Sequence, residues 1–161
     1  HNPDGTPNFS SPWSGNLTIY WGSSSDVCDP NPAINTMAAI EVAVISGSQA
    51  SPILTRSAHD PCSLGRRSNN NFSPSSHGGV VNGKSFAFST ALPFISSGLV
   101  VRVVSLYGGT SIGVIATTAL PSQGIVIDSI GDSGGTKRKI NVFKGYPQLP
   151  IQYFSYGLFS P

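Results

Sequence analysis

The chain has 161 residues, enough for one domain with a water-excluding core. Only 10% of the residues are charged, against about 25% in ordinary soluble proteins. Glycine, proline, serine, threonine and asparagine fill the polar positions instead, a composition typical of short strands joined by tight turns. The formal net charge of +2 is too small to hold a polyanion, which argues against nucleic acid as a partner.

The first fifteen residues contain three prolines and two glycines, which interrupt regular structure. We therefore predict an extended N-terminal arm over residues 1–15 and a single β-sandwich domain over residues 16–161. The start at His1 rather than at a methionine indicates a processed or truncated product. No stretch approaches the roughly 18 consecutive apolar residues of a membrane helix, so we expect no membrane segment in this chain.

Hydrophobic periodicity predicts the first strands. Residues 16–21 alternate apolar and polar side chains with the period of two that marks a half-buried strand. Residues 38–46 are apolar apart from Glu41 and the final Ser46 and are rich in β-branched side chains, which favours a strand. Gly47 and Ser48 then turn the chain into residues 52–58, so these two strands should form a hairpin.

Two stretches of the first half give weaker signals. Residues 32–37 allow one turn of helix before the second strand. Residues 60–82 hold three consecutive asparagines and a run of serine, proline and glycine, and we expect the least regular structure there.

The second half gives a more regular pattern of strands bounded by glycine or proline. Gly108-Gly109 and Gly131–Gly135 each separate two strands, and both predict hairpin turns because such loops need residues that tolerate positive φ. The whole pattern predicts an all-β fold, an antiparallel β-sandwich of about seven or eight strands with long loops. The predicted strands of this half are 84–90, 99–107, 111–118, 124–130 and 136–144, the last with the cations of an edge strand.

Cys28 and Cys62 are the two cysteines, and each lies in turn-rich sequence. An even count in a chain poor in charge favours one disulfide formed outside the cytoplasm. A metal site at these cysteines is disfavoured, because no suitably spaced histidine pair accompanies them. Asp26, Asp29 and Asn31 would offer oxygen ligands to calcium, but Asx turns explain their spacing equally well. We predict no metal and no cofactor.

Catalytic patterns are sparse, and the sequence predicts no enzyme. His1 would chelate copper through its amine and imidazole, as in secreted copper oxygenases, with His59 or His77 as a second ligand. The segment Gly131-Asp-Ser-Gly-Gly135 matches the sequence around the nucleophile of chymotrypsin-like proteases. Those enzymes need two barrels and a longer chain, so we interpret the segment as a hairpin tip. Three glycosylation patterns begin at Asn8, Asn16 and Asn71, a frequent chance match in an Asn/Ser-rich chain.

Two stretches, which together cover a little over half of the chain, combine strands and turns in a distinctive order. The first joins the segment Leu17–Gly22 to the strand Ala38–Ile45, then Thr55–Cys62, Arg66-Arg67 and Asn71-Phe72. The second joins Ile127–Gly131 to Lys137–Phe143, then Leu149-Pro150, Tyr153–Tyr156 and Leu158–Ser160. Both stretches resemble the soluble regions of minor, tip-associated proteins among the bacterial type IV pilin-like and pseudopilin-like surface proteins. The resemblance implies a β-rich head carried outward by an apolar helix, and it implies no catalytic residues; the helix is absent from this sequence.

We therefore expect an extracellular structural domain at the cell surface, one that packs against other surface or pilus subunits or adheres to a host surface or glycan. An alternative is a carbohydrate-binding or adhesin module, for which Trp13, Trp21, Tyr20 and Tyr107 would supply stacking rings; a copper oxygenase is the other alternative. The aromatic residues that we predict to make contacts are Phe9, Trp13, Tyr146, Tyr153, Phe154 and Tyr156.

Overall fold

Ten strands and one short helix form the fold in the computed structural model, which describes residues 8–146. They are β1 (Trp13–Gly15), β2 (Leu17–Trp21), β3 (Ala39–Gly47), β4 (Pro52–His59), α1 (Arg67–Asn70), β5 (Ser76–Val81), β6 (Lys84–Ala91), β7 (Ile95–Leu106), β8 (Ile112–Ala116), β9 (Gly124–Ser133) and β10 (Thr136–Gly145).

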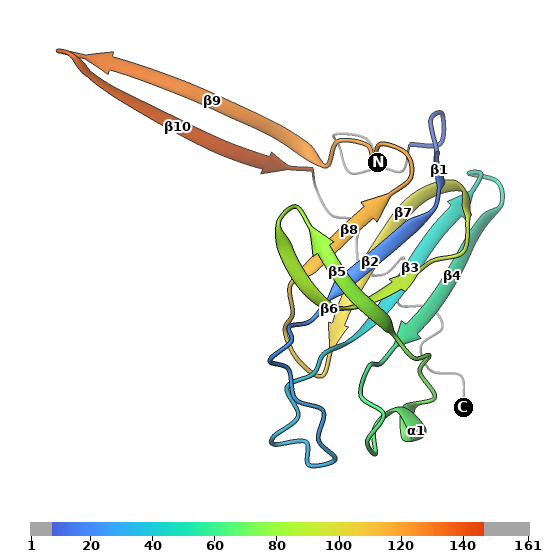
Figure 1. Cartoon of the computed structure of the whole chain (residues 1–161). Helices are drawn as coiled ribbons and strands as arrows, with labels where there is room; N and C mark the ends of the chain where they lie inside the picture. Colours follow the sequence, from blue (N-terminus) through green and yellow to red (C-terminus); the bar gives the residue numbers. More distant parts are fainter. Residues whose placement is uncertain (1–7, 147–161) are drawn as a thin grey trace.

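Eight of these strands form two four-stranded antiparallel sheets. The first sheet has the order β1-β7-β3-β4 and the second has the order β5-β6-β2-β8. Within residues 8–146, the remaining two strands, β9 and β10, pair only with each other, and they project from the sandwich as a long hairpin (Figure 1). The predicted all-β antiparallel sandwich with one disulfide, Cys28–Cys62, is confirmed.

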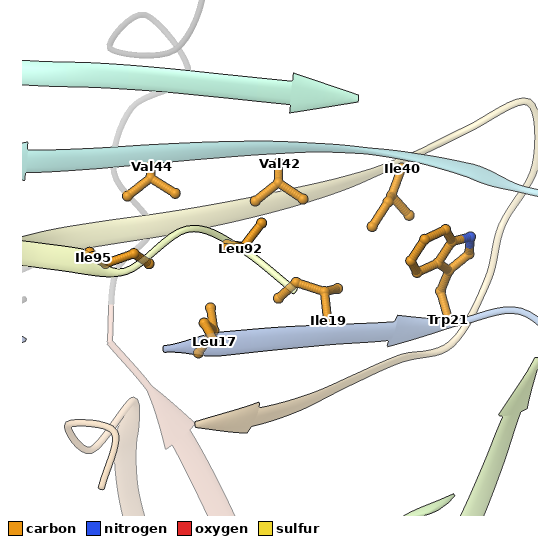
Figure 2. Close-up of a cluster of buried hydrophobic side chains, with 8 residues drawn as sticks. All are labelled: Leu17, Ile19, Trp21, Ile40, Val42, Val44, Leu92 and Ile95. Carbon is orange, nitrogen blue, oxygen red and sulfur yellow. The ribbon is translucent and has the colours of Figure 1, made fainter. Parts of the chain in front are cut away.

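The core lies between the two sheets and is built from alternate residues of the strands that face each other. On β2, Leu17, Ile19 and Trp21 are buried while the two residues between them are partly exposed, which confirms the predicted alternation. These three side chains point toward the β3 side chains across the sandwich (Figure 2). Burial of each aliphatic side chain contributes about 1.5 to 3 kcal/mol. The whole cluster consists of Leu17, Ile19, Trp21, Ile40, Val42, Val44, Leu92 and Ile95.

The three predicted hairpins have different outcomes. β3 and β4 pair from Ile40 opposite His59 to Gly47 opposite Pro52, as predicted. β9 and β10 also pair as predicted. The hairpin predicted at Gly108-Gly109 is wrong, because this loop leads from β7 in the first sheet to β8 in the second, where β8 pairs with β2. Paired glycines permit a reversal of the chain, but they do not select the strand that becomes the neighbour.

Residues 60–82 are more regular than predicted, since they contain α1 and β5. The sequence does not predict β5, because the two central residues of this strand are Gly78 and Gly79. A Cβ atom on Gly78 would collide with the carbonyl oxygen of Phe86, so this glycine permits close approach of the paired backbone. Residues 32–34 form a hydrogen-bonded turn rather than the single turn of helix that the sequence allows.

The last residues of the predicted N-terminal arm belong to the first sheet. Residues 13–15 form β1, which pairs with β7 through Trp13 opposite Gly98 and Gly15 opposite Ile95. Ser14 holds β1 against its neighbours. Its hydroxyl oxygen accepts the N–H of Ser97 at 3.0 Å, and its carbonyl accepts the hydroxyl of Thr118 at 2.9 Å. The last three residues of the predicted arm therefore form an edge strand of the first sheet.

Candidate functional site

The β9–β10 hairpin is the most distinct surface feature. Its ten pairs run from Thr136 opposite Ser133 to Gly145 opposite Gly124. The loop is two residues long, and both Gly134 and Gly135 have positive φ, 58° and 83°. Such a loop follows the right-handed twist of the strands, and glycine supplies both positions without steric strain. Every residue of the two strands except Gly124 is exposed.

The two faces of the hairpin differ in chemistry, because paired residues point to the same side. One face carries four aliphatic side chains between its middle and its sandwich end, with Arg138 and Lys144 beside them. We call this the aliphatic face, and its members are Ile125, Ile127, Ile140 and Val142. Each of the four is between 48% and 60% exposed.

The opposite face of the hairpin mixes apolar and polar pairs. Asn141 donates to Asp128 at 2.7 Å, and Lys139 lies 3.7 Å from the same carboxylate. Both charged side chains are at least half exposed, so this ion pair contributes little to stability. Phe143 is opposite Val126 on this face, and both are more than 60% exposed.

A second feature is an open apolar cleft between the sheets, with a volume of about 400 Å³. Its walls come from the inner sides of β2, β7 and β8, and Trp13 of β1 and the segment 120–123 complete it. The Nε1 atom of Trp13 is buried and has no hydrogen-bond partner among the described residues. The apolar side chains that line the cleft are Trp13, Leu17, Ile19, Leu99, Val100, Val101, Val103, Val114, Leu120 and Pro121.

A third feature is a buried charged network beside the disulfide. Asp60 is fully buried and accepts two hydrogen bonds from the guanidinium of Arg66, at 2.6 and 2.8 Å. It also accepts the backbone N–H of Cys62 and the side-chain amide of Asn70, each at 2.9 Å. Burial alone would raise the pKa of Asp60, but the hydrogen bonds from these three partners outweigh it and lower the pKa.

The same arginine connects this network to the surface. Its guanidinium carbon lies 4.4 Å from the ring centroid of Tyr107, a cation–π contact, and its Nη1 atom donates to Asn35 at 3.2 Å. Asn35 in turn donates to the Cys62 sulfur at 3.3 Å. The network therefore fixes the loops around the disulfide, and Asp60 is committed to structure rather than to proton transfer.

The predicted contact aromatics occupy different environments. Phe9 is 37% exposed in a turn, whereas Trp13 is partly buried and packs against the core. Tyr146 is partly exposed directly after β10, and its backbone N–H donates to the carbonyl of Gln123 at 3.0 Å. Tyr153, Phe154 and Tyr156 lie outside the described residues. Of the three described residues, Phe9 is therefore the one that is exposed rather than partly buried.

The rings proposed for a carbohydrate site do not form one platform. Trp21 is fully buried, and its indole N–H donates to the carbonyl of Ala38 at 3.0 Å. Tyr107 is exposed at the end of β7, while Tyr20 on β2 lies against Phe86 with the rings tilted by 49°. A sugar needs stacking rings that lie in one plane, whereas Tyr20 and Trp21 point to opposite faces of β2 and Tyr107 lies directly after β7.

The histidine and carboxylate candidates are also dispersed. His1 lies outside the described residues, His77 is exposed on β5, and His59 lies near the hydroxyl of Thr90 between the sheets. Burial lowers the pKa of His59, against a smaller opposing hydrogen bond at Pro74. Within residues 8–146, no three histidine, cysteine or acidic side chains lie close enough to share a metal ion.

The acidic turn residues act locally. Asp29 accepts the N–H of Asn31 at 2.7 Å, and Asn31 accepts the N–H of Ala33 at 3.0 Å, which is the Asx-turn geometry considered from the sequence. Asp26 similarly accepts the N–H of Ser23 at 2.8 Å. Their side chains order the loop that carries Cys28.

Sequence reasoning missed the Asp60–Arg66 pair and the projection of the hairpin. The Asp60–Arg66 pair had no usable signal, because five residues in a loop of mixed polarity lie between the two charges. The projection of the hairpin had a weak signal, since 124–144 has charges on both faces of its two strands, which disfavours packing of either face into the core of the domain. The described residues contain no helix with the length and hydrophobicity needed to span a membrane.

No protein-family model, curated protein or solved structure matches this chain.

Proposed function

We propose that this chain is a non-enzymatic, extracellular structural domain that packs against neighbouring subunits of a pilus-like surface assembly, with the β9–β10 hairpin as its contact arm. The disulfide supports a location outside the cytoplasm, because such bonds persist in oxidising compartments. The resemblance of the sequence to pilin-like heads supports the assembly.

The projecting hairpin is the observation on which this proposal rests. A two-stranded hairpin without a third strand or a covering layer is only marginally stable in water. This one also exposes seven large apolar side chains, four of them together on the aliphatic face, and contiguous exposed apolar surface is a mark of interaction sites. Contact with a neighbouring subunit would cover the aliphatic face and, by the same burial, stabilise the hairpin. The seven residues are Ile125, Val126, Ile127, Ile130, Ile140, Val142 and Phe143.

The low charge of the chain favours the same function. Only Arg138 and Lys144 stand beside the aliphatic face, so its burial would require little desolvation of charge. The rest of the domain offers hydrogen-bonding side chains around a rigid, covalently cross-linked scaffold. In the part of the chain that the structure describes, no geometry favours a sugar site over this interpretation; His1, on which the copper alternative depends, lies outside that part.

The test is recruitment to filaments sheared from the cells that produce the protein. We expect the purified chain to cosediment with this fraction, and the variant Ile127→Thr/Val142→Thr to lose most of this binding. Threonine keeps the β-propensity of the two strands while it removes the apolar surface. The matched control is Ile115→Thr on β8, which is also exposed but lies on the sandwich. Equal binding by both variants would exclude the hairpin as the contact arm.

A further inference from the structure

The apolar cleft lies between the two sheets and borders the core. Its lining includes Leu17 and Ile19, which belong to the buried core cluster. Val101 and Val103 of β7 also line the cleft, and they pack against the same cluster while remaining partly exposed. A molecule held in the cleft would therefore continue the core and cover apolar surface that the two sheets leave accessible.

The volume of the cleft suits a small molecule. The cleft measures about 400 Å³, whereas an apolar cavity of about 150 Å³ is enough for benzene. At the same ratio of about 25 Å³ per non-hydrogen atom, the cleft would hold a molecule of roughly 16 such atoms. Ligand pockets in proteins have volumes in this range and are lined mainly by apolar side chains, as this cleft is.

The lining of the cleft selects a neutral ligand, because none of the described residues that form it is charged. Two of its polar side chains hold their own loops. Asn8 Oδ1 accepts the hydroxyl of Ser10 at 2.8 Å and the N–H of Ser11 at 3.1 Å. Gln123 Nε2 donates to the carbonyl of Pro121 at 2.7 Å. A charged ligand would lose its hydration here without gaining an opposite charge.

Trp13 brings a hydrogen-bond donor to the wall of the cleft. Its Nε1 atom is buried, and within residues 8–146 it has no hydrogen-bond partner. The ring is held in place by β1, because Trp13 pairs with Gly98 and a Cβ atom on Gly15 would lie 2.8 Å from the ring atom Cζ2. A buried indole N–H ordinarily has an acceptor. A ligand oxygen that reached Nε1 would supply one.

We infer that the cleft binds a neutral, mainly aliphatic molecule of up to about 16 non-hydrogen atoms with one acceptor oxygen, such as a medium-chain ketone or alcohol. Trp13 Nε1 donates to this oxygen, and the hydrocarbon part lies against Val101, Val103 and Val114. The inference does not depend on the proposed function, because none of the described residues that line the cleft belongs to β9 or β10.

Nuclear magnetic resonance of the isotope-labelled full chain tests this site, with methyl hexyl ketone as the probe and octane as the matched molecule without an acceptor. We expect the ketone to move the indole N–H proton of Trp13 downfield in a saturable manner, because this N–H gains an acceptor, and octane to cause no such shift. Trp21 is the internal control, since its indole N–H already donates to the carbonyl of Ala38 at 3.0 Å. No saturable shift at Trp13 with the ketone, or an equal shift with octane, would overturn the proposal.

Two variants on β8 locate the bound ketone. Val114 is opposite Ile19 and lines the cleft, whereas the adjacent Ile115 points to the opposite face of the second sheet. We expect Val114→Asp to weaken ketone binding about tenfold or more, because a carboxylate enters the apolar wall, and Ile115→Asp to change it by less than about twofold. An unchanged indole resonance of Trp21 verifies the fold of each variant.

Equal weakening in the two variants, or unchanged binding in both, would place the ketone outside the cleft and contradict the proposal. Leu120→Asp replaces Val114→Asp if that variant does not fold. Leu120 also lines the cleft, and it is 47% exposed outside the strands, so a charge there leaves the sheets intact.

Discussion

Arg66 holds the carboxylate of Asp60 through two hydrogen bonds, although the carboxylate is completely buried and the arginine side chain is 13% exposed. Removal of one partner from such a pair leaves a buried charge without compensation. We expect Arg66→Met to lower the free energy of unfolding by about 3 kcal/mol, at the lower end for buried pairs because the Cys62 N–H and Asn70 still contact Asp60.

Chemical denaturation at neutral pH measures this loss. Arg138→Met is the control, because Arg138 is exposed on β10 and should change stability by no more than about 0.5 kcal/mol. A loss of similar size in both variants would mean that the buried pair does not stabilise the loops.

The pH dependence of stability follows from the lowered pKa of Asp60. Between the folded and unfolded pKa values the folded state binds fewer protons, so stability falls as the pH falls. The contribution of Asp60 should be complete above about pH 4 and should disappear as the pH drops through the lower, folded pKa. The difference in unfolding free energy between wild type and Asp60→Asn should therefore shrink only at acidic pH.

The comparison with Asp60→Asn isolates this carboxylate from His59. The pKa of His59 is also lowered, chiefly by burial, so protonation of His59 destabilises the fold below about pH 6.5 in both proteins. Because protonation of His59 lowers the stability of both proteins, its effect cancels in the difference between their unfolding free energies. A difference that stays constant from pH 7 to pH 2 would show that Asp60 has an ordinary pKa.

The disulfide should contribute more to the free energy of unfolding than any single exposed contact does. Cys28 and Cys62 are 34 residues apart, and the chain-entropy model gives about 3 to 4 kcal/mol for closing a loop of this length. We expect Cys28→Ala/Cys62→Ala to lose that amount in denaturant titrations, with Asp60 and Arg66 still paired. A loss below about 1 kcal/mol would indicate that the charged network alone orders these loops.

The sequence predicted the parts of the fold that depend on neighbours along the chain. The alternation of Leu17, Ile19 and Trp21 fixes which face of β2 is buried, and this pattern needs no knowledge of the partner sheet. The β3–β4 and β9–β10 pairs could also be predicted, because in each pair a short turn joins strands that follow each other directly.

Contacts between distant segments could not be predicted. Gly108-Gly109 has the composition of a hairpin turn, yet its strands enter different sheets because β8 finds β2 as its partner. Gly79 lies against the ring of Tyr20, a contact that only the folded chain brings about. The Asp60–Arg66 pair is similar, since its energy comes from burial by segments that the local sequence does not identify.

The turn of the hairpin offers a way to open the proposed contact arm without touching the sandwich. Gly135 has a φ of 83°, which a β-branched residue adopts at a cost of about 1 to 2 kcal/mol. An isolated hairpin has little stability to lose. We therefore expect Gly135→Val to speed amide exchange throughout residues 124–145 while exchange in β3 stays slow. Gly131→Val is the matched control, because Gly131 lies within β9 with no atom near its missing Cβ and no positive φ. If Gly131→Val opened the hairpin as far as Gly135→Val, the loop geometry would not be what holds β9 and β10 together. If Gly135→Val opened the hairpin and filament binding persisted, the contact would not require a preformed arm.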